Sequence, residues 1–227
     1  MFIVNKNIPA EAFERLGRYG KVAGFETKGI TYPEVSSHAD LFFCTDGKTL
    51  VMAPNTPQEY QDILSENGIT YSKGKMPTGM KYPESAGYNA VVTEKYLIHH
   101  LKITDPVILE IFHDKEMIHV SQGYTRCSLL PLSGNRFITS DQGIYKVLHK
   151  KNLPVLYTDP REILLPGFDH GLIGGTAGTY NNNVFFAGSL NHLRSGEQIR
   201  SFIELSGMEI IELYDGPLFD AGSILRV

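Results

Sequence analysis

The sequence predicts an α/β fold in which five similar units form a ring, a five-bladed α/β propeller with pseudo-symmetry. The first observation is a repeated order of apolar strand, tight turn, second apolar strand, amphipathic helix and third short strand. Full copies of this unit begin at Leu41, Ala90, Ser128 and Gly171, which are 49, 38 and 43 residues apart. A period of about 20–50 residues indicates a repeat architecture. The second observation is that the two ends of the chain resemble two parts of the same unit.

The incomplete units at the two ends predict how the ring closes. The chain opens with a second strand at Phe2–Val4, a helix near Ala10–Tyr19 and a third strand at Val22–Ala23, so this unit lacks its first strand. After the fourth full copy, one further apolar strand remains at Ser223–Val227. Pairing of this C-terminal strand with the N-terminal unit supplies the missing strand, and a closed ring needs no polar cap at its ends. We therefore expect one domain of five units over residues 1–227.

The four full copies present their elements in the same order. The first and second strands are short and rich in Val, Ile, Leu and Phe, as is typical of buried strands. We expect these strand pairs at Leu41–Cys44 and Leu50–Ala53, Ala90–Thr93 and Tyr96–His99, Ser128–Leu132 and Arg136–Thr139, and Gly171–Gly175 and Val184–Ala187. We expect the helices and third strands at Pro57–Asn67 and Ile69–Tyr71, Asp105–Asp114 and Met117–Val120, Gln142–Lys150 and Val155–Tyr157, and Ser195–Ser206 and Glu209–Leu213.

The helix near Pro57–Asn67 shows the signals on which these helix predictions depend. Thr56 followed by Pro57 is typical of the first residues of a helix. Tyr60 and Leu64 lie one turn apart, so one face of this helix is expected to pack inward.

The composition restricts the partners and the compartment of the protein. A net charge of −4 and a pI near 6.1 offer no basic surface for nucleic acid. No apolar run is long enough to span a membrane, and the first residues lead into the repeat rather than into a signal peptide. Cys44 and Cys127 are too few for a disulfide framework or a CxxC metal site, so we expect no metal and no other cofactor. We expect a cytoplasmic protein with a small-molecule substrate, and the sequence makes no prediction about its oligomeric state.

The residues just before each first strand are expected to meet at one mouth of the ring, because the first strands lie nearest its axis. These segments collect two histidines, three aspartates, an asparagine, an arginine and a cysteine. Such side chains are typical of acid–base or nucleophilic chemistry. The segments are His38-Ala39-Asp40, Gly87-Tyr88-Asn89, Thr125-Arg126-Cys127, Asp169-His170-Gly171 and Asp220-Ala221-Gly222.

Each of these side chains has a candidate role. A cysteine becomes a nucleophile when a neighbouring cation favours its thiolate, a histidine beside a carboxylate is a general acid or base, and carboxylates hold guanidinium groups by paired hydrogen bonds. Each also has a structural interpretation, since a lone cysteine is often a small buried hydrophobe and Asp or His can cap a strand or form an inner ion pair. The predicted site comprises catalytic Cys127, His38 and His170, and substrate-binding Asp40, Asn89, Arg126 and Asp169.

The ring of units and two short motifs resemble the pentein fold of the guanidino-group-modifying enzymes. That group includes arginine and agmatine deiminases, dimethylarginine hydrolases and amidinotransferases. His38-Ala39-Asp40 is similar to the His-x-Asp element of the group, and Gly171-Leu172-Ile173-Gly174-Gly175 is similar to the glycine-rich strand of its last repeat. The resemblance implies a hydrolase or transferase that acts on a C–N bond of a small guanidino substrate at the central mouth.

One departure from the resemblance keeps a second interpretation open. In those enzymes a nucleophilic cysteine follows the glycine-rich strand, whereas here Gly175-Thr176-Ala177-Gly178-Thr179 contains none. Either Cys127 acts from a different unit, or the protein is a non-catalytic binding protein on a pentein-like scaffold. The same architecture includes a non-enzymatic ribosome-associated factor, and a fold alone does not determine function.

Overall fold

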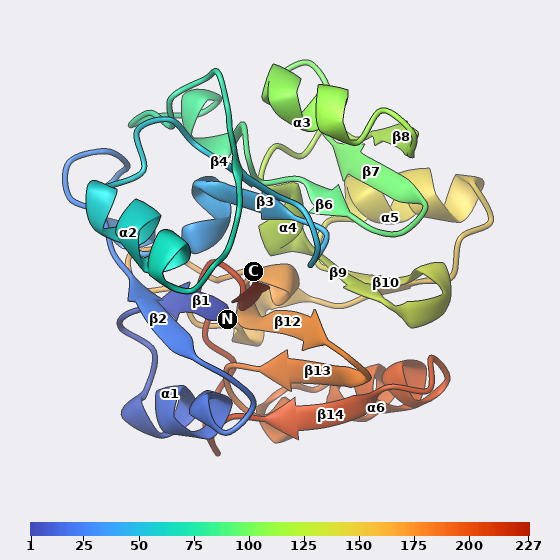
Figure 1. Ribbon diagram of the computed structural model, residues 1–227. Helices are drawn as coiled ribbons and strands as arrows, with labels where there is room; N and C mark the ends of the chain where they lie inside the picture. Colours follow the sequence, from blue (N-terminus) through green and yellow to red (C-terminus); the bar gives the residue numbers. More distant parts are fainter.

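A computed structural model describes all residues from Met1 to Val227, and it contains five three-stranded sheets with helices around them (Figure 1). In each sheet the middle strand pairs antiparallel with one neighbour and parallel with the other. The sheets are formed by β15 (Leu225–Arg226), β1 (Phe2–Asn5) and β2 (Val22–Phe25); β3 (Phe43–Thr45), β4 (Leu50–Met52) and β5 (Ser72–Lys73); β6 (Val91–Val92), β7 (Tyr96–His99) and β8 (Glu116–His119); β9 (Leu129–Leu132), β10 (Arg136–Thr139) and β11 (Val155–Tyr157); and β12 (Ala177–Tyr180), β13 (Asn183–Phe186) and β14 (Glu209–Glu212). The predicted α/β fold of repeated units is confirmed.

The helices lie on the outside of the sheets (Figure 1). They are α1 (Ala10–Gly17), α2 (Gln58–Glu66), α3 (Pro106–Ile111), α4 (Thr125–Ser128), α5 (Gln142–Lys150) and α6 (Gly196–Glu204), and α4 is the exception that lies near the centre. In α5, Ile144 and Leu148 lie one turn apart and are fully buried, so the apolar face packs inward as expected. None of these helices has the length and apolarity that a membrane crossing requires.

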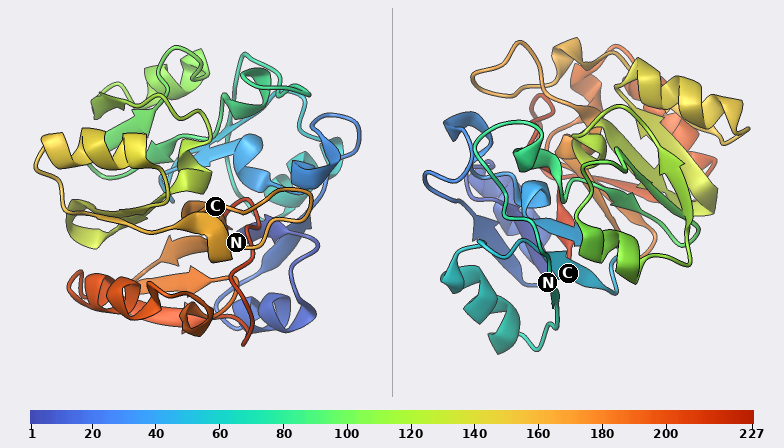
Figure 2. Two further views of the ribbon diagram at one scale, coloured as in Figure 1. Left: turned by 180° about the vertical axis from the view of Figure 1, so that it is seen from behind. Right: turned by 90° about the horizontal axis from the view of Figure 1, so that it is seen from above.

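The two ends of the chain lie side by side near the middle of the molecule (Figures 1 and 2). β15 pairs antiparallel with β1, with Phe2 opposite Arg226 and Ile3 opposite Leu225. The backbone N–H of Val227 also donates to the carbonyl of Met1 at 2.9 Å. The predicted pairing of the C-terminal strand with the N-terminal unit is therefore confirmed.

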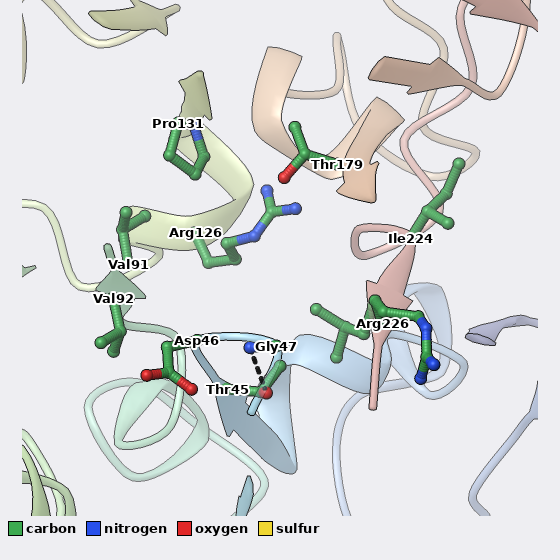
Figure 3. Close-up of a pocket in the computed structure, with 11 residues that line it drawn as sticks. Thr45, Asp46, Gly47, Val91, Val92, Arg126, Pro131, Thr179, Ile224 and Arg226 are labelled. Atoms are coloured by element: carbon green, nitrogen blue, oxygen red, sulfur yellow. Dashed lines mark hydrogen bonds between the residues drawn. The ribbon is translucent and has the colours of Figure 1, made fainter. Parts of the chain in front are cut away.

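The first strands of the five sheets surround one axis. β3 contacts β6, and β12 contacts both β9 and β15. A small pocket of about 90 Å³ is lined by a residue from each of these five strands (Figure 3), namely Thr45, Val92, Pro131, Thr179 and Arg226. The ends of the strands that carry the hairpin turns therefore meet at one end of the axis.

The first strand of the last unit was predicted at the wrong residues. Instead of a strand at Gly171–Gly175, the chain forms a 3-10 turn, η6 (Ile173–Thr176), and the strand β12 follows it. The backbone is crowded there, because a Cβ on Gly174 would lie 2.2 Å from the Arg126 carbonyl oxygen. A similar turn, η2 (Ala39–Leu41), precedes β3, and the third strand predicted at Ile69–Tyr71 lies slightly later, at β5. The residues directly before β3 and β12 are consequently 3-10 turns rather than strands.

The close approach of β12 and β15 gives a stability prediction for the ring. A Cβ on Gly178 would lie 1.9 Å from the Ile224 carbonyl oxygen, so Gly178→Ala forces backbone apart at the point of closure. We expect a loss of about 1–3 kcal/mol in the free energy of unfolding, as for other overpacked sites. Chemical denaturation measures this loss. Gly17→Ala is the matched control, since nothing lies within 4 Å of its Cβ, and it is expected to be neutral or slightly stabilising. Equal denaturation midpoints for the two variants would contradict the close packing of β12 against β15.

Candidate functional site

Four buried polar side chains from four different units meet on the axis of the ring. Asp40, Asn89, Cys127 and Ser223 each lie within three residues before a first strand, and none is more than 3% exposed. The Cys127 thiol donates a hydrogen bond to Oδ2 of Asp40 at 3.0 Å, and the Ser223 hydroxyl donates to the same oxygen at 2.6 Å. We call these four residues the central cluster.

Asn89 positions Cys127 through the backbone of α4. Its Oδ1 accepts hydrogen bonds from the backbone N–H groups of Arg126 at 2.7 Å and Cys127 at 3.1 Å. Its Nδ2 donates to the Cys127 sulfur at 3.4 Å and to the Asp40 carbonyl at 3.2 Å. Asn89 therefore accepts from the free backbone N–H groups in the first turn of α4 and holds the thiol against Asp40.

Arg126 points away from this cluster toward the opposite end of the axis. Its guanidinium donates to the carbonyls of Gly174 at 2.8 Å and Ala177 at 2.9 Å, and it lines the pocket shown in Figure 3. Burial lowers the pKa of Arg126, and the nearby Asp40 opposes this shift. Arg126 and Cys127 are adjacent in sequence, but they face opposite ends of the ring.

A second pocket, of about 200 Å³, lies on the other side of the central cluster and is lined by Cys127. We call it the Cys127 pocket. His38, His170 and Asp220 also line it, and Leu165 and Phe168 of the connector between β11 and β12 form part of its wall. Most of the remaining wall is apolar, so the polar groups in it are few and face a shared space. A concave site of this kind is typical for binding of a small molecule.

The electrostatics of the pocket favour a neutral thiol. Burial raises the pKa of Cys127 well above its usual range, and the carboxylates of Asp40 and Asp220 raise it further. Burial also raises the pKa of Asp220, and His38 opposes that shift from 3.9 Å, measured between Nε2 and Oδ1. The Asp220 carboxylate is held by the backbone N–H of Leu172 at 2.8 Å. Formation of a thiolate at Cys127 therefore needs a positive charge that the side chains around it do not supply.

The structure brings some of the predicted site residues together and separates others. Cys127, Asp40 and Asn89 belong to the central cluster, and His38 and His170 lie in the wall of the Cys127 pocket. Nδ1 of His170 is 2.9 Å from the Gly171 carbonyl oxygen. Asp169 is exposed and does not line the pocket, and Arg126 faces the opposite end, so their substrate-binding roles stay predictions.

Two residues that the structure brings to this site, Ser223 and Asp220, are not among the predicted site residues. Ser223 was assigned to the last strand, but β15 begins only at Leu225. Gly222 and Ser223 both have positive φ values, of 63° and 69°, so the chain turns here and directs the Ser223 hydroxyl into the cluster. The segment Asp220-Ala221-Gly222 had been recognised as equivalent to the other polar segments, which is the signal that indicates Asp220.

The contact between Asp40 and Cys127 predicts an increase in thiol reactivity on removal of the carboxylate charge. Asp40→Asn removes a negative charge 3.0 Å from the sulfur, so we expect alkylation of Cys127 by iodoacetamide at neutral pH to accelerate about tenfold or more. Mass spectrometry of the labelled protein separates Cys127 from Cys44. Asp62→Asn, which makes the same change of charge on the exposed face of α2, should leave the rate unchanged. An unchanged rate in Asp40→Asn would show that this carboxylate does not control the thiol.

Comparison with solved structures identifies the class of fold. Agmatine deiminase from C. jejuni matches with a TM-score of 0.56 and 12% identity, over 93% of this chain and 74% of that chain. DDAH from Pseudomonas aeruginosa, a mutant in complex with citrulline, matches with a TM-score of 0.53 and 10% identity, over 93% and 90%. SxtG, an amidinotransferase from Microseira wollei, matches with a TM-score of 0.53 and 12% identity, over 93% and 87%. The protein therefore has the pentein fold of guanidino-modifying enzymes, as the sequence resemblance implied, and at these identities the likeness establishes the fold alone.

The family assignment comes from a sequence match over almost the whole chain. The model of the "Family of unknown function (DUF6873)" matches residues 3–225, so the chain belongs to the DUF6873 family. No curated protein matches the chain by sequence.

Proposed function

We propose that this protein is a hydrolase or transferase that acts on a C–N bond of a small guanidino-type substrate in the Cys127 pocket. The observation that carries the proposal is the pocket itself, which places the Cys127 thiol beside His38 and Asp220, with Asp40 behind the sulfur. Its volume of about 200 Å³ is below the roughly 300–1,000 Å³ of ordinary ligand pockets, which favours a small substrate.

A cationic substrate supplies the charge that the pocket lacks. A guanidinium ion is planar, and carboxylates such as that of Asp220 bind it by paired hydrogen bonds. Its positive charge beside Cys127 lowers the pKa of the thiol and counters the two carboxylates that raise it. Binding and activation of the nucleophile are then the same event, which explains why the thiol is neutral in the free protein.

The proposed reaction uses Cys127 as the nucleophile and histidine as the acid and base. His38 or His170 takes the proton of the Cys127 thiol, and the thiolate attacks the guanidino carbon and forms a C–S bond. The C–N bond to the leaving nitrogen then breaks as that nitrogen takes the proton back from the histidine. The product of this step is a thiouronium bound to Cys127 and a free amine or ammonia. Attack by water returns the thiol and a ureido product, whereas attack by an acceptor amine transfers the amidino group.

A second candidate function is that of a non-catalytic binding protein, and one observation favours it. The Cys127 sulfur is buried and donates its hydrogen to Asp40, an arrangement typical of a structural rather than a reactive cysteine. In this case the pocket would bind a small cation without changing it.

Incubation of the full chain with a panel of guanidino compounds distinguishes the two candidates. Arginine, agmatine, a methylated arginine and guanidinoacetate cover the substrate classes, and the measurements are release of ammonia or amine, formation of a ureido product and thermal stabilisation. Turnover of one compound supports the enzyme, and stabilisation without turnover supports the binding protein. The absence of both for every compound would refute a guanidino ligand.

A further inference from the structure

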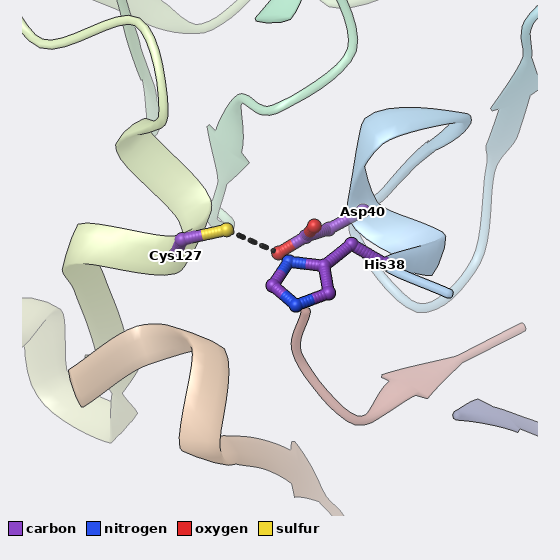
Figure 4. A group of neighbouring side chains, drawn as sticks. All are labelled: His38, Asp40 and Cys127. Carbon is purple, nitrogen blue, oxygen red and sulfur yellow. Dashed lines mark hydrogen bonds between the residues drawn. The ribbon is translucent and has the colours of Figure 1, made fainter. Parts of the chain in front are cut away.

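Three side chains with different metal-binding atoms meet beside the Cys127 pocket (Figure 4), which His38 and Cys127 line. One ligand atom each from His38, Asp40 and Cys127 lies within 4.8 Å of the other two, and all three residues are buried. His38 and Asp40 come from the turn around η2 and Cys127 comes from α4. The sequence placed these three residues in one predicted site, but it predicted no metal there.

One carboxylate oxygen of this group has no hydrogen-bond partner although it is buried. Oδ1 of Asp40 is unpaired, and Asp40 is 0% exposed. A buried polar atom without a partner costs free energy, and such atoms in native proteins call for an explanation such as an ion. In Figure 4 the imidazole lies beside the hydrogen bond between the Cys127 sulfur and Oδ2 of Asp40, so the ring faces the same space as the other two groups.

The three donor types select the class of metal. Thiolate, imidazole and carboxylate together are ligands of Zn²⁺, whereas Mg²⁺ and Ca²⁺ prefer oxygen alone. Three protein ligands with a fourth open position are typical of sites that exchange ligands or water, unlike the four-ligand structural sites. Here the open side is the Cys127 pocket.

The surroundings support both the histidine and the carboxylate as ligands. Oδ1 of Asp220 lies 3.9 Å from Nε2 of His38, and a carboxylate at the far nitrogen of a metal-binding histidine fixes the orientation of its ring. The Ser223 hydroxyl donates to Oδ2 of Asp40 at 2.6 Å, so Oδ1 is the oxygen that is free for a metal.

We propose that His38, Asp40 and Cys127 form a Zn²⁺ site that opens into the Cys127 pocket. When the ion binds, the bond between sulfur and hydrogen at Cys127 is replaced by a bond between sulfur and zinc, and the proton leaves to the solvent. The bound ion coordinates the Cys127 sulfur and lies where the cluster opens into the Cys127 pocket. It therefore competes with a cationic substrate and blocks alkylation of the thiol. The site does not depend on the proposed function, because it concerns binding of the metal alone.

Co²⁺ is the probe, since it replaces Zn²⁺ and has visible absorption. The full chain is stripped with a chelator and titrated with Co²⁺. We expect one ion per chain, intense bands of tetrahedral cobalt and a thiolate-to-cobalt charge-transfer band, all of which disappear on addition of Zn²⁺. Cys127→Ser is expected to lose the charge-transfer band. Cys44→Ser is the matched control, because Cys44 is also buried but its thiol has only the Ala90 carbonyl as a hydrogen-bond partner, and it should keep the band.

Two further measurements keep the test decisive if Cys127→Ser does not fold. His38→Gln retains the thiol, and we expect it to weaken Co²⁺ binding by more than the roughly 10–100-fold that loss of an outer partner of a metal ligand costs. In the unmodified chain, Zn²⁺ is expected to protect Cys127, and not Cys44, from iodoacetamide. Absence of the charge-transfer band in natively folded protein, or its persistence in Cys127→Ser, would overturn the site. Cobalt binding by a chain that, when free of metal, turns over no guanidino compound would leave the metal site standing and refute only the proposed enzyme.

Discussion

Replacement of Cys127 by alanine is expected to reduce turnover of a guanidino substrate by about 10³-fold or more. The proposed reaction passes through a bond between the Cys127 sulfur and the guanidino carbon, and alanine has no atom that can form it. A factor of 10³ corresponds to about 4 kcal/mol of lost transition-state stabilisation. Binding of the substrate depends mainly on the Asp220 carboxylate and the pocket wall, so we expect the loss in kcat and only a small change in affinity.

Cys44→Ala is the control for the loss of a buried thiol. Cys44 is 1% exposed and lies in β3, outside the Cys127 pocket, so this variant is expected to keep full activity at a small cost in stability. A single-turnover experiment with mass spectrometry provides a second readout. The unmodified chain and Cys44→Ala should show the mass of a thiouronium adduct, and Cys127→Ala should not. Full activity of Cys127→Ala would remove Cys127 as the nucleophile.

The repeated units could be predicted from the sequence because their signal is local and recurs. Short apolar strands, polar hairpin turns and amphipathic helices repeat in order. The orphan strand at the C-terminus predicted pairing with the N-terminal unit, and the structure shows this pairing with Phe2 opposite Arg226. The turns before the first strands could not be predicted, because they depend on close backbone contacts between units. Gly175 shows this, since a Cβ there would lie 1.9 Å from Oδ1 of Asp220, a residue of another unit.

The dependence on contacts between units also explains which of the site residues could be predicted from the sequence. Asp40, Asn89 and Cys127 were found because they occupy equivalent positions before their strands, and the axis of the ring brings such positions together. Ser223 was missed because two residues with positive φ delay the start of β15. Equivalence of position says nothing about the direction of a side chain, and for this reason Arg126 was placed at the mouth although it faces the opposite end.

The central cluster separates the two ends of the ring. Asp40, Asn89, Cys127 and Ser223 are joined by hydrogen bonds and are almost fully buried, so the axis is closed between the pocket at Cys127 and the pocket at Arg126. The Asp220 carboxylate lines the pocket on one side of this cluster, and the Arg126 guanidinium lines the pocket on the other. Because Arg126 is turned away, no arginine or lysine side chain lines the Cys127 pocket. After burial, the carboxylates of Asp40 and Asp220 are the next cause of the raised pKa of Cys127. The cationic substrate and the Zn²⁺ site that we propose both depend on this asymmetry of charge.

Mild acid is expected to destabilise the fold through His99. This histidine ends β7 and is fully buried, with Nε2 donating to the Gly123 carbonyl at 2.8 Å and Nδ1 accepting from the Thr104 hydroxyl at 2.8 Å. Burial lowers the pKa of His99 to about 4 from its ordinary 6.5. Between these two values the unfolded chain binds a proton that the folded chain does not, so stability falls as pH falls. The total loss from pH 6.5 to pH 4 is about 3 kcal/mol.

Denaturation of the unmodified chain and of His99→Gln from pH 8 to pH 4 tests this prediction. Below pH 6.5 the unmodified chain is expected to lose up to about 1.4 kcal/mol per pH unit more than the variant, because one extra proton is taken up on unfolding. Between pH 7 and pH 8 the two curves should run parallel, whatever the absolute stability of the variant. Parallel curves over the whole range would show that His99 is not the acid-sensitive group. Since Gly123 precedes Tyr124, which lines the Cys127 pocket, we expect protonation of His99 to weaken the pocket wall before the whole chain unfolds.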